Sequence, residues 1–384
     1  MRKLVVHCGL HKTGSSAIQD FLFDNAQLIN NSKNYKLFSE NKKGSVQSRN
    51  LSSWVDHSSV NQSSARVHKE FYTSLLASAE NNKTLIVSSE AFSWLLEDNE
   101  VMSFYDNLKT IFDEIKVIFY LRRQDKLALS HFSQRAKAYH REGTFYSTTE
   151  KNFLPYMDSN AKKYFDYNNR INLFCNNFGE ENIIVRIFDK ADLKNGDVVE
   201  DFKGLLQLDI PHKKKLQNKA FGFEQVKFHE ELIKRHIPQS SLLWKVATNI
   251  NSTRKVSCNK SEAFNFYMQF DGGNKELNKR LKISSTPNLF DMDFSNYPLV
   301  YDFNWKVTDI NKIIDSSIAS INHYDYILSP KVIDLIRDSA VLLEKNDLKK
   351  ALELMELAKK LRPNGSFINS KVNTYKKIIN EADL

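Results

Sequence analysis

The strongest constraint on the fold of this chain is a set of four short segments that are apolar almost throughout. Strands with one solvent-exposed face alternate apolar and polar residues, whereas strands of a parallel sheet are covered on both faces and read as continuous apolar runs. The four segments therefore predict buried parallel strands over Leu4–His7, Thr84–Ser88, Lys116–Leu121 and Asn182–Phe188.

Segments with helical periodicity separate and follow these strands. Apolar residues recur at three- and four-residue spacing after the first strand, and an amphipathic segment follows the fourth strand, beginning near Asp197. A more polar helical face follows the third strand. The residues on these three faces are Ile18, Phe21, Leu22 and Ala26; Val198, Val199, Phe202, Leu205 and Leu206; and Leu127, Ser130, His131 and Gln134. The alternation of strands and helices predicts an α/β fold with a central parallel sheet flanked by helices in three layers.

Two regions are expected to depart from this alternation. Residues 28–64 are rich in Asn, Ser and Lys, and we expect either a surface excursion that carries substrate loops or solvated chain without such a role. Residues 216–300 are expected to be mostly helical, with loops at NSTRKVS (251–257) and SSTPNLFDMDFSNYP (284–298).

The pattern changes again near the C-terminus. From Ser329 the chain reads as helix, Lys-Asn-Asp turn, helix, Arg-Pro-Asn-Gly break and helix, which is similar to one tetratricopeptide-type unit followed by a further helix. We therefore expect a main domain over 1–300, a linker over 301–328 and a helical segment over 329–384. A single repeat cannot bury its apolar face, so this segment is expected to pack on the main domain, on a second copy of the chain or on a protein partner.

Composition limits the class of protein. The 384 residues are 41% hydrophobic and 26% charged, with no apolar run of membrane-spanning length and no signal-peptide pattern, so a cytoplasmic protein without a membrane span is expected. The net charge of +9 favours polyanionic partners, but no nucleic-acid-binding motif is present and nucleic acid is not expected as a partner. The three cysteines Cys8, Cys175 and Cys258 are expected to be reduced structural thiols, with a reactive Cys8 as the alternative.

The segment that follows the first strand has the composition of an anion-binding loop. Residues 9–16 read Gly-Leu-His-Lys-Thr-Gly-Ser-Ser and lead into a helix, where free N–H groups, the helix dipole and two hydroxyls favour phosphate or sulfate. The nucleotide-kinase loop G-x-x-x-x-G-K-[ST] has the same glycine spacing but needs a lysine where this chain has Ser15. Here the positive charge is on Lys12 instead, and the loop therefore points away from a kinase or an ATPase.

This loop resembles the 5′-phosphosulfate loop of sulfotransferases that use 3′-phosphoadenosine 5′-phosphosulfate (PAPS), whose bacterial members commonly carry His-Lys-Thr-Gly-Thr-Thr. The resemblance implies a P-loop-like fold and a PAPS site formed by Lys12, Thr13, Gly14, Ser15 and Ser16. It covers residues 1 to about 300 and is weakest over the polar excursion; the C-terminal helices lie outside it.

A second motif, KVIFYLRRQDKLALSHFSQ, supports the same resemblance. It puts Arg122 at the end of a strand and Ser130 eight residues later in a helix, and the family holds the 3′-phosphate of PAPS with an Arg and a Ser at this spacing. A guanidinium can bind a phosphate edge through two N–H groups, with the hydroxyl as a further donor. Without the resemblance, Arg122 and Arg123 would read as an ordinary surface pair.

Three residues are candidates for catalysis. Glu90 follows the second strand in LIVSSEAF and is the candidate base for the acceptor hydroxyl, although it could instead cap the next helix or position Lys12. Lys12 is the candidate for stabilising the leaving phosphate oxygen, without a metal ion. His11 is the substitute base, with a role in orienting the backbone as the alternative. Arg186, in the fourth strand, could lie near the ligand or form a structural salt bridge.

The resemblance implies transfer of the sulfuryl group from PAPS to an acceptor hydroxyl, with 3′-phosphoadenosine 5′-phosphate (PAP) as the product. An acceptor of the saccharide or polysaccharide class suits the basic composition, but the sequence identifies neither the sugar nor the position. Two other classes stay open: a P-loop NTPase or kinase with an atypical loop, and a non-catalytic interaction protein that acts through its tetratricopeptide-like segment.

Overall fold

The computed structural model describes residues 1–38, 41–42, 45–46, 55–57, 65–137, 153–212, 220–237, 241–323 and 330–382. Contacts divide the chain into two compact units, Met1–Ile310 and Asn311–Leu384. The boundary falls within helix α12 (Val307–His323), so much of the segment predicted as a linker is helical.

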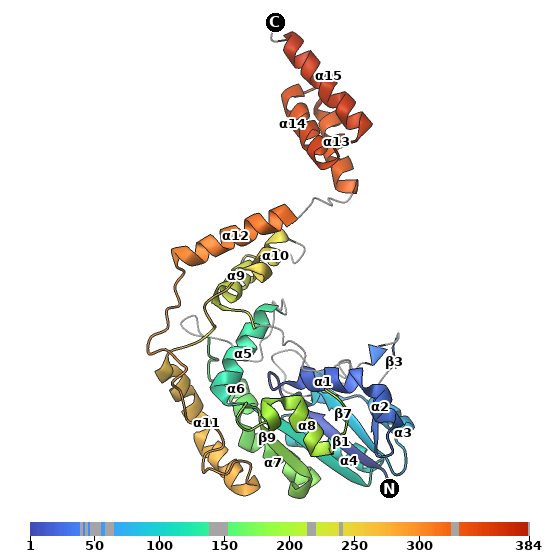
Figure 1. Cartoon of the computed structure of the whole chain (residues 1–384), viewed down its shortest axis with the longest axis vertical. Helices are drawn as coiled ribbons and strands as arrows, with labels where there is room; N and C mark the ends of the chain where they lie inside the picture. The colour runs from blue at the N-terminus through green and yellow to red at the C-terminus, as the bar shows by residue number, and fades with distance from the viewer. Residues whose placement is uncertain are drawn as a thin grey trace. The chain divides into compact units, whose positions relative to one another are not determined.

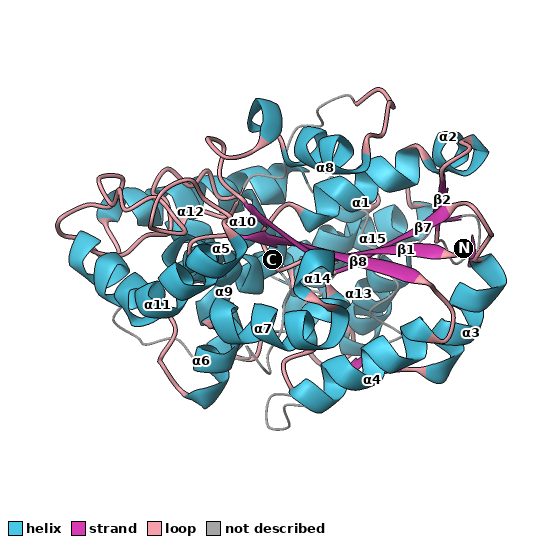
Figure 2. Cartoon of the chain, turned by 90° about the horizontal axis from the view of Figure 1, so that it is seen from below, coloured by secondary structure: helices cyan, strands magenta, loops and turns pink. Residues whose placement is uncertain are grey.

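The first unit is built on a five-stranded sheet in the order β2-β7-β1-β8-β9, in which every neighbouring pair is parallel (Figures 1 and 2). The strands are β1 Lys3–Cys8, β2 Tyr35–Leu37, β7 Thr84–Ser89, β8 Glu114–Leu121 and β9 Ile183–Ile187. All four strands predicted from the apolar runs are confirmed. The α/β class and the parallel sheet are confirmed with them.

Strand β2 was not predicted and corrects the expectation for residues 28–64. The described part of that region contains the end of helix α2 (Ala26–Asn31) and the strand β2, which pairs with β7 at one edge of the sheet. Three residues in a polar sequence carry no recognisable strand pattern. Pairing with β7 decides their conformation, helped by the Leu37 N–H, which donates to Asn30 Oδ1 at 2.8 Å. Short strand pairs β3 (Asn41–Lys42) with β4 (Ser45–Val46) and β5 (Val55–His57) with β6 (Ala65–Val67) follow; the remainder of the excursion lies outside the described residues.

Helices cover both faces of the sheet, which explains the continuous apolar runs. Val5, Ile86 and Ile118 face the layer formed by α1 and α8, whereas Val6 and Val87 face the opposite layer of α3, α4 and α7 (Figure 2). These helices are α1 Ser15–Asp24, α3 Lys69–Ser78, α4 Asp98–Lys109, α7 Tyr167–Phe178 and α8 Val198–Leu206. Successive strand residues point to opposite faces, so a strand buried on both sides must be apolar at every position.

The rest of the first unit is mostly helical, as predicted for the described part of 216–300. Its helices are α5 Gln124–Lys137, α6 Ser159–Phe165, α9 Phe223–Lys234, α10 Leu242–Asn249 and α11 Lys260–Leu281. The two predicted loops are confirmed, since residues 251–257 and 284–298 contain no helix or strand. Among the described helices, none combines the length and the apolar character that crossing a membrane requires.

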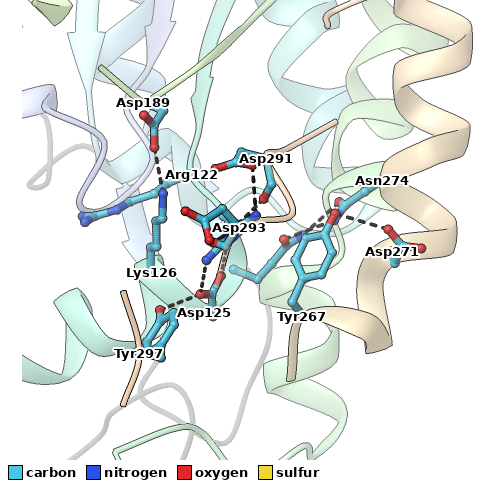
Figure 3. A network of polar contacts seen from close by, with 12 residues as sticks. Arg122, Asp125, Lys126, Asp189, Tyr267, Asp271, Asn274, Asp291, Asp293 and Tyr297 are labelled. Carbon is cyan, nitrogen blue, oxygen red and sulfur yellow. Dashed lines mark hydrogen bonds and ion pairs between the residues drawn. The ribbon is translucent and has the colours of Figure 1, made fainter. Parts of the chain in front are cut away.

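Arg123, two residues after the end of strand β8, holds the loop 284–298 in place through hydrogen bonds. Its guanidinium is 3% exposed, forms a two-bond ion pair with Asp125, and donates to the carbonyls of Asp291 and Asp293 at 2.7 and 2.8 Å. The hydroxyl of Tyr297 donates to the same Asp125 carboxylate at 2.5 Å (Figure 3). Arg123 is therefore a buried structural residue, and the reading of Arg122 and Arg123 as a surface pair is wrong.

The second unit contains helices α13 (Pro330–Leu343), α14 (Leu348–Leu361) and α15 (Ser366–Ala382), which confirms the predicted order of three helices. They share a small core of Ile333, Ala340, Ala351, Met355, Ala358, Ile368, Val372 and Tyr375. The likeness to a tetratricopeptide unit stays a prediction.

Candidate functional site

The candidate site lies at the carboxyl edge of the sheet, where adjacent strands end side by side. Gly9 follows β1, Glu90 follows β7, Arg122 follows β8 and Phe188 follows β9. From β1 the chain leads toward the β7 and β2 side, whereas from β8 it leads to β9 on the other side. Ligands of open α/β sheets bind outside the carboxyl ends at such a reversal of strand order. The two predicted cofactor motifs follow the two strands that flank this point.

The loop 9–16 is braced from within by its own hydroxyl groups. Thr13 Oγ1 and Ser15 Oγ both donate to the carbonyl of Leu10, at 2.6 and 3.0 Å, and both side chains are buried. A side chain at Gly9 would meet Ser15 Oγ at 2.6 Å, so glycine is needed there for close packing. The hydroxyls of Thr13 and Ser15 are thus already used within the loop, whereas Ser16 is an exposed residue.

Gly14 sets the start of helix α1. It has φ +80°, and a β-carbon there would lie 2.8 Å from both Phe188 Cε2 and Val198 Cγ1. Glycine adopts this left-handed conformation without steric cost. Within the described part of the chain no side chain caps the first N–H groups of α1, which lie at the positive end of the helix dipole.

Arg122 is bound directly to this loop. Its Nη1 donates to the carbonyl of Lys12 at 3.1 Å, across 110 residues of sequence. Lys12 has φ +61°, which is uncommon for a residue with a side chain, and the hydrogen bond accepted by its carbonyl helps to hold that conformation. The structure therefore brings the two predicted cofactor motifs into contact.

The surroundings of Arg122 orient its remaining N–H groups. The guanidinium lies 5.8 Å from the ring centre of Phe188, and the Tyr167 hydroxyl donates to the Arg122 carbonyl at 2.7 Å. Burial lowers the pKa of Arg122 from its ordinary value, although an arginine stays charged at neutral pH. The Lys12 carbonyl is the only hydrogen-bond acceptor that the described residues offer to this guanidinium. A phosphate could therefore engage its other N–H groups.

Ser130 is placed by helix α5, which begins two residues after Arg122. It lies in the second turn and is partly buried; the contacts of the described residues include none between it and Arg122. Lys126 lies one turn earlier, on the same face as Ser130, and pairs with Asp189 Oδ2 at 2.8 Å beside Arg122 (Figure 3).

Glu90 lies next to the glycine loop. It occupies the N-cap position of the short helix η2 (Ala91–Trp94), but its side chain makes no capping hydrogen bond. The capping alternative for Glu90 is therefore wrong. A β-carbon at Gly9 would lie 3.5 Å from Glu90 Cγ. The pKa of Tyr164 is raised mainly by burial, and the nearby Glu90 carboxylate raises it further.

His11 is held in a cluster of aromatic side chains. Its Nδ1 lies 2.8 Å from the Tyr164 hydroxyl and 3.3 Å from Ser93 Oγ. Its ring centre lies 5.0 Å from that of Trp94 and 5.3 Å from that of His131. His11 Nδ1 is therefore already engaged by the hydroxyls of Tyr164 and Ser93.

Several residues at this edge could not be found from the sequence. Trp94, His131, Tyr164, Tyr167 and Phe188 surround the loop and Arg122, but no motif distinguishes them from core aromatics. Arg186 forms an ion pair with Asp201 at 2.6 Å, which matches the structural alternative for it. Cys8 is fully buried, and burial raises the pKa of its thiol, which matches the expected structural role. Among the described residues, no cluster of three or more His, Cys, Asp or Glu could hold a metal ion.

Fold and site together define an α/β protein whose candidate ligand site, formed by two cationic residues and the start of a helix, lies at the carboxyl edge of a parallel sheet. No protein-family model matches the chain. Over 205 residues it is 30% identical to an uncharacterized protein of Archaeoglobus fulgidus, a match that covers 50% of this chain and 52% of that protein. The chain thus spans about half the length of the curated relative it matches.

Proposed function

We propose that the first unit is a PAPS-dependent sulfotransferase that transfers a sulfuryl group to an acceptor hydroxyl, with a saccharide as the favoured class of acceptor. The observation that carries the proposal is the hydrogen bond from Arg122 to the carbonyl of Lys12. It brings together two motifs that resemble the two halves of a PAPS site, at the point of the sheet where nucleotides bind in related architectures. The P-loop-like character of the fold is part of this proposal.

The residues fit an adenosine donor with anionic groups at both ends. The N–H groups of the loop and of the first turn of α1 would hold the 5′-phosphosulfate. Arg122, with Ser130, would hold the 3′-phosphate, since Arg122 has N–H groups to spare and a charge that burial shields from solvent. The hydroxyls of Thr13 and Ser15 support the loop in this scheme and do not contact the donor.

Glu90 and Lys12 have separate roles in the proposed reaction. Glu90 takes the proton of the acceptor hydroxyl while the acceptor oxygen forms a bond to sulfur. The bond between sulfur and the bridging oxygen breaks at the same time, and Lys12 stabilises the negative charge that develops on the departing phosphate. The products are the sulfated acceptor and PAP. His11 stays the substitute base.

A P-loop NTPase or kinase is the second enzyme class to be tested. It is disfavoured because Ser15, which occupies the position of the kinase lysine, is buried and donates to the Leu10 carbonyl. Magnesium-dependent turnover of ATP that survives the change Arg122→Ala would favour this class over the sulfotransferase.

The proposal is tested by binding and by transfer. We expect titration calorimetry to detect PAP, and sulfur-labelled PAPS to pass its label to one member of a panel of neutral and acidic oligosaccharides. The Arg122→Ala and Lys12→Ala proteins should both bind PAP more weakly than the unaltered chain. A folded protein that binds neither PAPS nor PAP at millimolar concentration would exclude the proposal.

For the second unit we propose a tetratricopeptide-like role in protein contact. Apolar side chains remain exposed on its helices, among them Leu335 at 65%, Leu342 at 79% and Phe367 at 50%. Sedimentation velocity of the full chain and of a chain ending at His323 tests for self-association; equal monomeric behaviour of both would exclude the unit as a dimer contact.

A further inference from the structure

Arg170 on helix α7 is a buried cation without the partners that such a group normally has. Its side chain is 2% exposed, and within the described residues neither Nε nor Nη2 has a hydrogen-bond partner. No ion pair with a carboxylate is present for it in the described part of the chain. Buried charges in proteins are nearly always paired and hydrogen-bonded, so this one needs an explanation.

The guanidinium lies directly behind the candidate site. It is 4.9 Å from the ring centre of Tyr164, and Tyr164, Tyr167, Cys8 and Asp166 all act on it electrostatically. Tyr164 contacts His11 of the loop, and Tyr167 donates to the carbonyl of Arg122. Cys8 immediately precedes the loop at the end of β1. Tyr164 therefore links Arg170 to the loop 9–16, and Tyr167 links it to Arg122.

Burying the Arg170 side chain costs folding free energy that burying an apolar core residue would not. Removing a cation from water is costly, and within the described residues no hydrogen bond to Nε or Nη2 offsets that cost, which the more distant carboxylate of Asp166 reduces only in part. Burial lowers the pKa of Arg170 for the same reason, because the charged form of the side chain loses its hydration. An unbranched apolar side chain of similar volume would fill the site without this cost.

We propose that Arg170 is a buried positive charge that strengthens the binding of polyanionic nucleotides at the loop 9–16 without touching them. The inference rests on the proposed function, and it makes Arg170 a positioning residue in electrostatic terms. Among the described residues the Asp166 carboxylate attracts Arg170 without forming an ion pair with it, so a ligand anion adds negative charge near a cation that is incompletely compensated. Solvent and salt screen a buried charge weakly, so its attraction reaches the ligand through Tyr164 and Tyr167.

The attraction should scale with the charge of the ligand. Replacing Arg170 by methionine should weaken the binding of PAP, which carries two phosphates, about tenfold. Adenosine 5′-phosphate carries about half that charge, so its binding should weaken only about threefold, the square root of the first factor. Burial lowers the pKa of a lysine far more readily than it discharges an arginine, so Arg170→Lys keeps its proton only in part and should bind PAP with an affinity between those of the unaltered chain and Arg170→Met.

The experiment measures Kd by calorimetry for both nucleotides on the full-length chain and on Arg170→Met, Arg170→Lys and Lys116→Met. Lys116→Met is the matched control, because it also removes one positive charge but near the amino end of β8, away from the site. Urea unfolding of the same proteins is the second measurement. We expect Arg170→Met to be at least as stable as the unaltered chain and Lys116→Met to bind both nucleotides normally.

Each outcome decides between the two proposals. Failure of the unaltered chain to bind PAP excludes the sulfotransferase and this inference together. Normal PAP binding by Arg170→Met excludes the inference alone, as does an equal loss for the two nucleotides. An Arg170→Met protein that does not fold, or that unfolds at lower urea concentration, shows that Arg170 supports the core and also overturns the inference.

Discussion

Arg122 Nη1 donates to the backbone carbonyl of Lys12 at 3.1 Å, which joins the end of β8 to the loop that follows β1. One guanidinium thereby holds the loop in place, while its other N–H groups make no hydrogen bond within the described residues. The contact exists because β1 and β8 are neighbours in the sheet, with Cys8 level with Phe119. Five predictions follow from this geometry and from the packing around it.

Replacing Arg122 by lysine should weaken PAP binding about 10- to 100-fold, because the ammonium keeps the charge but loses the two-bond contact and the bond to the Lys12 carbonyl. Calorimetric titration measures the change. Arg235→Lys is the matched control, since Arg235 is 67% exposed and forms its ion pair with Glu231. If Arg122→Lys binds PAP as tightly as the unaltered chain, Arg122 is not a phosphate ligand.

Replacing Glu90 by glutamine should leave PAP binding intact and lower turnover about 10²- to 10⁴-fold, the usual contribution of a positioned base. The measurement is single-turnover transfer of labelled sulfuryl to the acceptor found by screening. Glu80→Gln, on an exposed residue paired with Lys36, is the control. Full turnover by Glu90→Gln would remove Glu90 as the base and leave His11 to be tested.

Replacing Gly14 by alanine should destabilise the first unit by about 1–3 kcal/mol, because Gly14 has φ +80° and the new methyl group would collide with Phe188 and Val198. Gly272→Ala is the matched control. Gly272 lies within helix α11 with open space around it, so alanine there should stabilise by about 0.5–1 kcal/mol. Urea unfolding gives both values, and equal effects at the two positions would contradict the assigned geometry.

Breaking the buried ion pair by Arg123→Ala should cost about 3–5 kcal/mol, because Asp125 would remain buried without its counter-ion. The exposed pair broken by Arg235→Ala should cost at most about 1 kcal/mol. Both free energies come from urea unfolding. A small loss for Arg123→Ala would show that the loop 284–298 is held by other contacts.

The buried His7 should make the protein less stable in mild acid. Burial lowers the pKa of His7 from 6.5 to about 3 in the folded chain, so between these values the unfolded chain binds a proton that the folded chain does not. The free energy of unfolding should therefore fall by about 1.4 kcal/mol for each pH unit below 6.5 on account of this residue.

Urea unfolding of His7→Phe from pH 7 to pH 4.5 measures this contribution as the difference in slope from the unaltered chain. The phenyl ring keeps the packing against Tyr120 and Phe202 but cannot titrate. Identical slopes for His7→Phe and the unaltered chain would mean that His7 takes up a proton in the folded state.

The sequence by itself determined the α/β class, four of the five strands and the position of the loop, because burial on both faces forces continuous apolar runs that can be read without a structure. Strand β2 left no such signal, since its conformation comes from pairing with β7 along one edge. Local pattern also identified Lys12 and Arg122, but only the order of the strands decided that they meet.

Tertiary structure alone decided which side chains work together. Two neighbouring arginines have different surroundings: Arg123 is buried in an ion pair with Asp125, while Arg122 donates to the Lys12 carbonyl of the loop. Tyr164 and Arg170 come from α6 and α7, far along the chain, and lie behind the loop because those helices cover one face of the sheet. Contacts between residues so distant in sequence depend on packing, and packing leaves no local pattern to read.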